Sequence, residues 1–164
     1  MTLASEMDTV VKKILPYLAR REYDMETDLD FETAMKLKTR YAMGYADILV
    51  TCGKKSPQFL IEAKRDSRTL TSKDRDQALE YGKTLKTAFV VVTNGRVIQC
   101  FNTISGKPLK WNGKLTDKIP SRSQLPKVLS ALKATPGTDN LIIGDNLAPF
   151  RPSLPTLLPE LCIA

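Results

Sequence analysis

Histidine is absent from this chain of 164 residues. Without an imidazole, the chain has no means for Ser-His or Cys-His nucleophilic catalysis, for histidine-based nuclease mechanisms or for zinc sites that depend on histidine. Any acid–base chemistry must therefore come from carboxylates, lysines or tyrosines.

Cysteine and long apolar runs are also scarce. Cys52, Cys100 and Cys162 are odd in number and widely spaced, which argues against a disulfide framework or a metal knuckle and favours free thiols in a reducing compartment. The longest apolar run, Ala88 to Val92, is far too short to span a bilayer. We therefore expect a soluble, cytoplasmic protein.

The composition suits one compact domain with an anionic partner. Hydrophobic residues make up 42% of the chain and charged residues 26%, which is enough for a sizeable core. The formal net charge of +7 favours nucleic acid as the partner, although the same charge could serve solubility alone.

The amino-terminal segment has the apolar spacing of one helix face. This spacing predicts a helix from about Glu6 to Ala19, opened by Ser5 and Asp8 as a capping box. Pro16 should bend or weaken its last turn.

The next part of the chain predicts strands. Residues 28–32 alternate in polarity as an edge strand does, and residues 33–40 form a polar, basic connection. Two apolar runs, residues 45–51 and 57–64, are separated by turn-forming residues and should make a hairpin.

The following segments extend the sheet. Residues 67–86 predict a helix capped by Thr71 and Asp74, and residues 87–93 and 96–102 predict two strands joined by a tight Asn-Gly turn. The predicted fold class is therefore α/β, with a mixed β-sheet flanked by helices.

We divide the chain into a core of residues 1–118, with a further short strand near Trp111, and a carboxyl-terminal region of residues 119–164. This second region should contain a helix at 121–133. It ends in a Pro-rich apolar tail, which we expect to pack on the core or on a partner.

Two charges stand at the end of an apolar strand. Residues i and i+2 of a strand face the same side, so Glu62 and Lys64 project together. A hairpin centred between Lys54 and Lys55 places Asp47 directly across from Glu62.

Two opposed carboxylates repel each other unless they share a cation. Carboxylates select hard ions such as Mg²⁺ or Mn²⁺, and Lys64 could orient or deprotonate a water and offset the charge that develops on phosphorus. This chemistry is metal-assisted phosphodiester hydrolysis. The alternative is an exposed cross-strand ion pair that arises by chance.

The order of several motifs along the chain is more specific evidence of function than the charges of Glu62 and Lys64 alone. Asp47, then Glu62-Ala63-Lys64, then Gln77-x-x-x-Tyr81 resembles the PD-(D/E)XK nuclease superfamily, and within it the amino-terminal nuclease domain of type I restriction enzyme R subunits. The resemblance covers roughly residues 5–102 and implies a restriction-endonuclease-like core.

The resemblance also implies roles for single residues. Asp47 and Glu62 would bind Mg²⁺, with Mn²⁺ as a substitute, and the carbonyl of Ala63 would be an extra ligand. Lys64 would be the catalytic lysine. Glu6 matches an acidic residue that in such nucleases faces the metal site, but it could equally be an ordinary first-turn acid that the helix dipole stabilises.

DNA contacts are expected from a polar helix face and from basic residues. Gln77 and Tyr81 are four residues apart and share a helix face that could reach a phosphate or base, although Tyr81 also fits simple core packing. Arg65, Lys54 and Lys55 could hold the phosphate backbone. Nearby aspartates dilute this basic patch, and a solvated charged loop would look similar.

The sequence thus predicts a Mg²⁺-dependent endodeoxyribonuclease with DNA as its partner. Other restriction-system subunits or a motor domain are further candidate partners, because no G-x-x-x-x-G-K-[ST] motif for ATP-driven translocation is present. The chain would then be either a freestanding nuclease or an excised domain. The alternatives are a catalytically silent nuclease fold that binds DNA or protein, and an assembly domain that uses the tail after Pro149.

Overall fold

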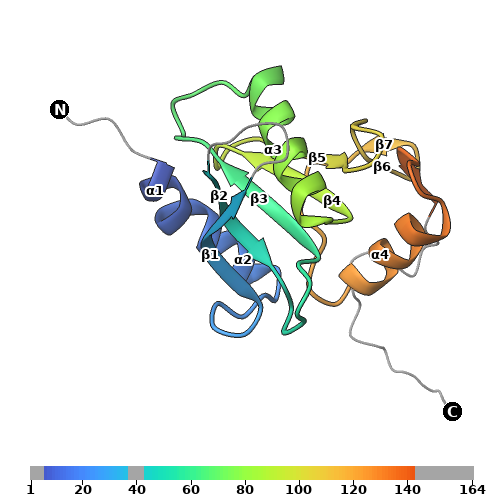
Figure 1. Cartoon of the computed structure of the whole chain (residues 1–164), viewed down its shortest axis with the longest axis horizontal. Helices are drawn as coiled ribbons and strands as arrows, with labels where there is room; N and C mark the ends of the chain where they lie inside the picture. Colours follow the sequence, from blue (N-terminus) through green and yellow to red (C-terminus); the bar gives the residue numbers. More distant parts are fainter. Residues whose placement is uncertain (1–5, 37–42, 143–164) are drawn as a thin grey trace, which may run out of the picture.

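The computed structural model describes residues 6–36 and 43–142 and shows a mixed α/β fold (Figure 1). Five strands form the main sheet in sequence order: β1 (Leu29–Lys36), β2 (Met43–Val50), β3 (Phe59–Ala63), β4 (Phe89–Thr93) and β5 (Ile98–Asn102). Strands β3 and β4 are parallel, and the other neighbouring pairs are antiparallel. The predicted fold class is confirmed.

The amino-terminal helical segment has three parts: α1 (Glu6–Thr9), a π-helical turn η1 (Val10–Ile14) and α2 (Leu15–Arg20). The prediction of one continuous α-helix from Glu6 to Ala19 was wrong, because a π-helical turn interrupts it. The Leu15 N–H bonds back to the Val10 carbonyl, five residues earlier, directly before Pro16, which has no N–H of its own to donate. Ser5 of the predicted capping box lies outside the described residues.

Strand β1 is longer than its sequence predicted. It includes residues 33–36, which were assigned to a polar connection, and it pairs with β2 from Leu29 opposite Val50 to Lys36 opposite Met43. The strand lies at the edge of the sheet. The rest of that predicted connection, residues 37–40, lies outside the described residues.

The β2–β3 hairpin has the predicted register. Ile48 lies opposite Ile61, and Val50 lies opposite Phe59. Continuing this register by one residue toward the free end of the hairpin brings Asp47 across from Glu62.

Helix α3 (Ser72–Leu85) connects the parallel strands β3 and β4. Thr71 and Asp74 form the predicted capping box, in which each side chain bonds to the other residue's backbone N–H. Gly82 lies so close to Val90 of β4 that a Cβ atom there would collide with the valine side chain. The helix therefore packs tightly over the sheet.

The two faces of the sheet pack against different helices. On one face, Phe59, Ile61 and Ala63 of β3 join a core that includes residues of the amino-terminal helical segment. On the other face, Leu60 packs in a separate core with α3 residues such as Ala78. Since side chains alternate along a strand, Glu62 lies on the α3 face.

The carboxyl-terminal part adds a small second sheet in the order β7-β6-β8, and one helix. The elements are β6 (Lys110–Trp111), β7 (Lys114–Leu115), α4 (Leu125–Ala134) and β8 (Asn140–Leu141). The predicted short strand near Trp111 and the predicted helix are confirmed. The Pro-rich tail lies outside the described residues, and the boundary at residue 118 stays a prediction.

Helix α4 packs on the main core. Leu125, Val128 and Leu132 belong to the same buried cluster as Ile14 and Leu18. No helix in the described part of the chain is long and apolar enough to cross a membrane.

Candidate active site

The site is built at the carboxyl end of β3. Glu62 and Ala63 end this strand, and Lys64 follows directly, with its N–H donating to the Thr93 carbonyl of β4 at 2.8 Å. Asp47 comes from β2, and its Oδ2 accepts a hydrogen bond from the Ala63 N–H at 2.7 Å. The structure therefore brings Asp47, Glu62 and Lys64 together.

The two oxygens of Glu62 have different surroundings. The residue is only 3% exposed, and its Oε2 accepts a hydrogen bond from Lys64 Nζ at 3.0 Å. Its Oε1 is buried and makes no hydrogen bond to any residue that the structure describes. Leaving a buried polar atom unsatisfied costs about 1–3 kcal/mol, and more for a charged group. An arrangement of this kind is expected where a ligand completes the site.

The charges of the site are strongly coupled. Burial raises the pKa of Glu62, the negative charges of Asp47 and Glu6 raise it further, and Lys64 opposes them, which leaves the pKa at about 8. Burial lowers the pKa of Lys64, but the neighbouring carboxylates of Glu62, Glu6 and Asp74 outweigh that effect and raise it above the ordinary 10.5. Lys64 is therefore a cation at neutral pH, whereas Glu62 keeps its proton well above the pH at which an ordinary glutamate releases it.

Glu6 is exposed and opens α1. Its charge raises the pKa of both Glu62 and Lys64. The amino-terminal helix therefore places this acid within electrostatic reach of Glu62 and Lys64, and its role as a metal ligand stays a prediction.

A chain of hydrogen bonds holds Lys64 in place. Its Nζ donates to Gln77 Oε1 at 3.1 Å, and Gln77 Nε2 donates to the Tyr81 hydroxyl at 2.9 Å. Tyr81 is only 5% exposed and belongs to the core beneath α3. Both ends of the Gln77 amide are thus used within the protein, and the DNA contacts expected of these two residues stay a prediction.

The donor set can be compared with the needs of Mg²⁺. Within residues 6–36 and 43–142, no three histidine, cysteine, aspartate or glutamate side chains gather closely enough to hold a metal ion. However, Mg²⁺ is usually held by one or two carboxylates, and waters and phosphate oxygens complete its shell. Asp47 and Glu62, with an unsatisfied oxygen on Glu62, fit that requirement.

Comparison with known proteins identifies the family. A family model described as the N terminus of the type I restriction enzyme R protein matches residues 8–120, which include the whole main sheet and the site. The chain belongs to this family. A search of curated proteins gave no match.

A solved structure supports the fold of this R-protein N-terminal domain. The chain is similar to a fragment described as an HsdR subunit of a type I restriction enzyme from Vibrio vulnificus YJ016, with a TM-score of 0.60 and 21% sequence identity. The match covers 90% of this chain and 28% of that one. The similarity therefore concerns the fold, over less than a third of that protein.

The predicted basic residues of the R-protein domain do not all lie near its carboxylates. Arg65 is exposed and directly follows Lys64, at the edge of the site. Lys54 and Lys55 are exposed in the β2–β3 turn, which joins the strands at the opposite end of the hairpin from Glu62. The structure does not bring these two lysines to the site, because residues close in sequence diverge along extended strands.

Sequence reasoning missed the structural part played by Asn94 in the β4–β5 turn. This buried side chain donates to the Arg68 carbonyl at 2.7 Å and accepts hydrogen bonds from the N–H groups of Arg96 and Val97, both at 2.9 Å. It thereby ties the loop after Lys64 to the β4–β5 turn. The Asn-Gly pair predicted a tight turn, but no sequence signal pointed to this distant contact.

Proposed function

We propose that this domain is a metal-dependent DNA endonuclease of the PD-(D/E)XK type, as in the nuclease domain of type I restriction enzyme R subunits. The observation that carries the proposal is the buried Glu62, with one unsatisfied oxygen, beside Asp47 and a protonated Lys64. A buried acid kept in this state is costly unless it serves a ligand.

Each residue has a defined task in this proposal. Asp47 and Glu62 would hold Mg²⁺, or Mn²⁺ in its place, with the Ala63 carbonyl as a further ligand, and the Ala63 N–H fixes the orientation of the Asp47 carboxylate. A bound ion would lower the pKa of a coordinated water and neutralise phosphate charge.

Lys64 fits one of its two expected tasks better than the other. The neighbouring carboxylates raise its pKa, so Nζ keeps its proton near neutral pH. It is therefore suited to donate a hydrogen bond to a phosphate oxygen and to stabilise the charge that develops there. Proton abstraction from water would require a neutral amine, which these neighbours disfavour.

The test compares wild-type protein with Glu62→Gln and Lys64→Ala on supercoiled DNA, in Mg²⁺, Mn²⁺ and chelator. Glu26→Gln, in an exposed loop, is the matched control. We expect metal-dependent nicking in the wild type and the control, and a loss of at least about 100-fold in the two site variants. Full activity in either site variant would overturn these assignments.

A second candidate is a nuclease fold that binds DNA or a partner protein without cleaving it. The direct contact between Lys64 Nζ and Glu62 Oε2 favours this alternative, because Lys64 already has a partner in the absence of metal. Retention of DNA in chelator, with no turnover in either metal, would support it. The same samples therefore separate the two functions.

We also propose DNA as the principal partner, and other restriction-system subunits or a motor domain as further partners. This extension rests on the family and on the 28% of the Vibrio vulnificus chain that the match covers. Activity of the isolated domain on DNA would show that the chemistry needs none of these subunits.

A further inference from the structure

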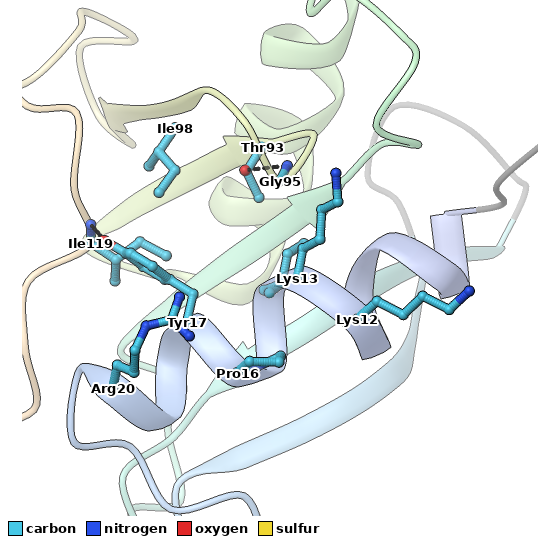
Figure 2. A pocket seen from close by; sticks show the side chains of 10 residues that line it. Lys12, Lys13, Pro16, Tyr17, Arg20, Thr93, Gly95, Ile98 and Ile119 are labelled. Atoms are coloured by element: carbon cyan, nitrogen blue, oxygen red, sulfur yellow. Dashed lines mark hydrogen bonds between the residues drawn. The ribbon is translucent and has the colours of Figure 1, made fainter.

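A basic groove lies between the amino-terminal helical segment and the β4–β5 turn (Figure 2). It encloses about 360 Å³. Lys12, Lys13 and Arg20 line it from the helical side, and Thr93 and Gly95 line it from the turn. No function described above uses this groove.

The groove gathers positive charge without an acid among its lining residues. Lys12 and Arg20 are exposed, and no ion pair to either is found within the described residues. Lys13 differs, because its Nζ contacts Asp66 at 2.8 Å. Two unpaired cations that face one hollow favour an anionic ligand.

The spacing of the cations favours a polymer over a small anion. Lys12 and Arg20 are eight residues apart, and a helix of that length rises about 12 Å. Successive phosphates of one DNA strand advance about 3.4 Å along the helix axis, so several of them cover this span.

The floor of the groove suits a sugar or a base. Tyr17 lies between Arg20 and Ile119 in Figure 2, and its hydroxyl accepts a hydrogen bond from the Ile119 N–H at 3.0 Å. Its ring and the side chains of Pro16 and Ile98 add apolar surface. Aromatic rings beside cations are the usual means of holding a nucleic-acid strand without reading its sequence.

The groove and the carboxylates share one end of the sheet. Thr93, in the groove wall, pairs with Ala63, and its carbonyl accepts the Lys64 N–H at 2.8 Å. The Lys13–Asp66 ion pair joins the groove wall to the loop that follows Lys64. The groove opens on the face of the sheet that packs against the amino-terminal helical segment, whereas Glu62 lies on the α3 face. A bound strand would therefore reach the site around the end of the sheet where Ala63 and Thr93 lie.

We infer that this groove binds the sugar-phosphate backbone of the DNA substrate beside the phosphate that is cleaved. The inference deepens the proposed nuclease function and rests on it. Lys12 and Arg20 contact phosphates, and the ring of Tyr17 packs against a sugar. Because these contacts are to the backbone, they position the strand without sequence preference.

The test is DNA binding by the double variant Lys12→Ala/Arg20→Ala, measured by fluorescence anisotropy with a labelled duplex in chelator. The control is Lys127→Ala/Lys133→Ala on the exposed face of α4, which removes the same net charge. We expect affinity to fall about tenfold or more in the groove variant, and its salt slope to decrease by about two. The α4 variant should match the wild type.

If DNA affinity falls equally in the two double variants, the loss comes from net charge alone and the inference is overturned. The inference is also overturned if affinity falls in neither variant. Competition by millimolar ADP or inorganic phosphate at constant ionic strength would instead indicate a site for a small anion, which also contradicts it. Thermal unfolding of both variants confirms that they are folded. Binding is measured without metal, so it is independent of cleavage. If the protein binds DNA through the groove but never cleaves it, the proposed nuclease function is wrong and the assignment of the groove still holds.

Discussion

At the scale of single residues, Glu62 links the proposed chemistry to the stability of the fold. Its pKa is raised from the ordinary 4.5 to about 8, first by burial and then by Asp47. The folded protein therefore retains a proton that the unfolded chain releases above pH 4.5 or so. The stability that this proton contributes is fully present below that pH and is lost as the pH rises to about 8.

The first prediction follows from this decrease of stability with rising pH. In chelator, the free energy of unfolding of the wild type should fall between about pH 4.5 and 8 relative to that of Glu62→Gln. The slope of the difference should approach about 1.4 kcal/mol per pH unit, the value for one proton. Urea unfolding of both proteins across this range measures it. Parallel pH profiles would show that Glu62 does not retain its proton.

Gln77 connects Lys64 to α3, and this gives the second prediction. Gln77→Ala removes the acceptor that holds Lys64 Nζ, so cleavage should fall about tenfold or more, while DNA retention in chelator changes little. Tyr81→Phe removes only the hydroxyl behind Gln77 and should have a smaller effect. A loss of retention that equals the loss of cleavage would instead assign Gln77 to direct DNA contact.

At the scale of elements, the β4–β5 turn organises what surrounds the site. Gly95 has φ +86°, and a Cβ there would approach Lys13 Cδ to 2.9 Å, so the turn packs directly on the π-helical turn η1. Asn94 binds the loop after Lys64 on the other side. The turn thus fixes the site loop and the basic groove relative to each other.

The third prediction concerns Asn94. Asn94→Ala should destabilise the protein by about 1–3 kcal/mol, because it removes three hydrogen bonds of a buried side chain, each worth about 0.5–1.5 kcal/mol: one to the Arg68 carbonyl and two from turn N–H groups. Asn94→Asp is the matched variant, since it keeps the acceptor for the turn and loses only the donor to Arg68. Urea unfolding compares the two, and an alanine variant as stable as the wild type would contradict this account.

Local patterns predicted most elements, and the exceptions have physical causes. The capping box at Thr71 and the register that places Asp47 across from Glu62 depend on neighbours in sequence or on one turn, and the structure has both. Strand β1 was predicted too short because pairing with β2 outweighs its polar composition. Lys54 and Lys55 are close to Glu62 in sequence, but the extended strands carry them to the opposite end of the hairpin, and their predicted contact with DNA stays a prediction.

The site itself was only partly predictable. The spacing of Glu62 and Lys64 identified the residues that share a face, since this follows from strand geometry alone. The hydrogen bond from Lys64 to Gln77 and the unsatisfied oxygen on Glu62 depend on how α3 packs over β3. Such contacts between distant segments follow from the packed fold and not from periodicity.

At the scale of the whole molecule, the carboxyl-terminal part closes the core on the face opposite α3. Leu125 and Ile119 are at most 2% exposed and share a buried cluster with Leu18. The Tyr23 hydroxyl donates to the Pro120 carbonyl at 2.7 Å, and Arg21 Nε donates to the Ile119 carbonyl at 2.8 Å. The predicted core of residues 1–118 therefore lacks residues that bury Leu18 and accept hydrogen bonds from Arg21 and Tyr23.

The fourth prediction is that residues 1–118 do not fold alone. Removing one large buried aliphatic side chain costs about 2–5 kcal/mol, and a domain has only about 5–15 kcal/mol of net stability, so the loss of several such side chains with α4 exceeds what the rest can supply. Circular dichroism and thermal unfolding of residues 1–118 and 1–142 test it. We expect cooperative unfolding only for the longer chain, with Leu125→Ala in the full chain less stable by about 2–5 kcal/mol and exposed Lys127→Ala unchanged. If the shorter chain unfolds cooperatively at the same temperature as the full chain, the boundary at residue 118 is a true domain boundary and α4 is an accessory to an independently folding core.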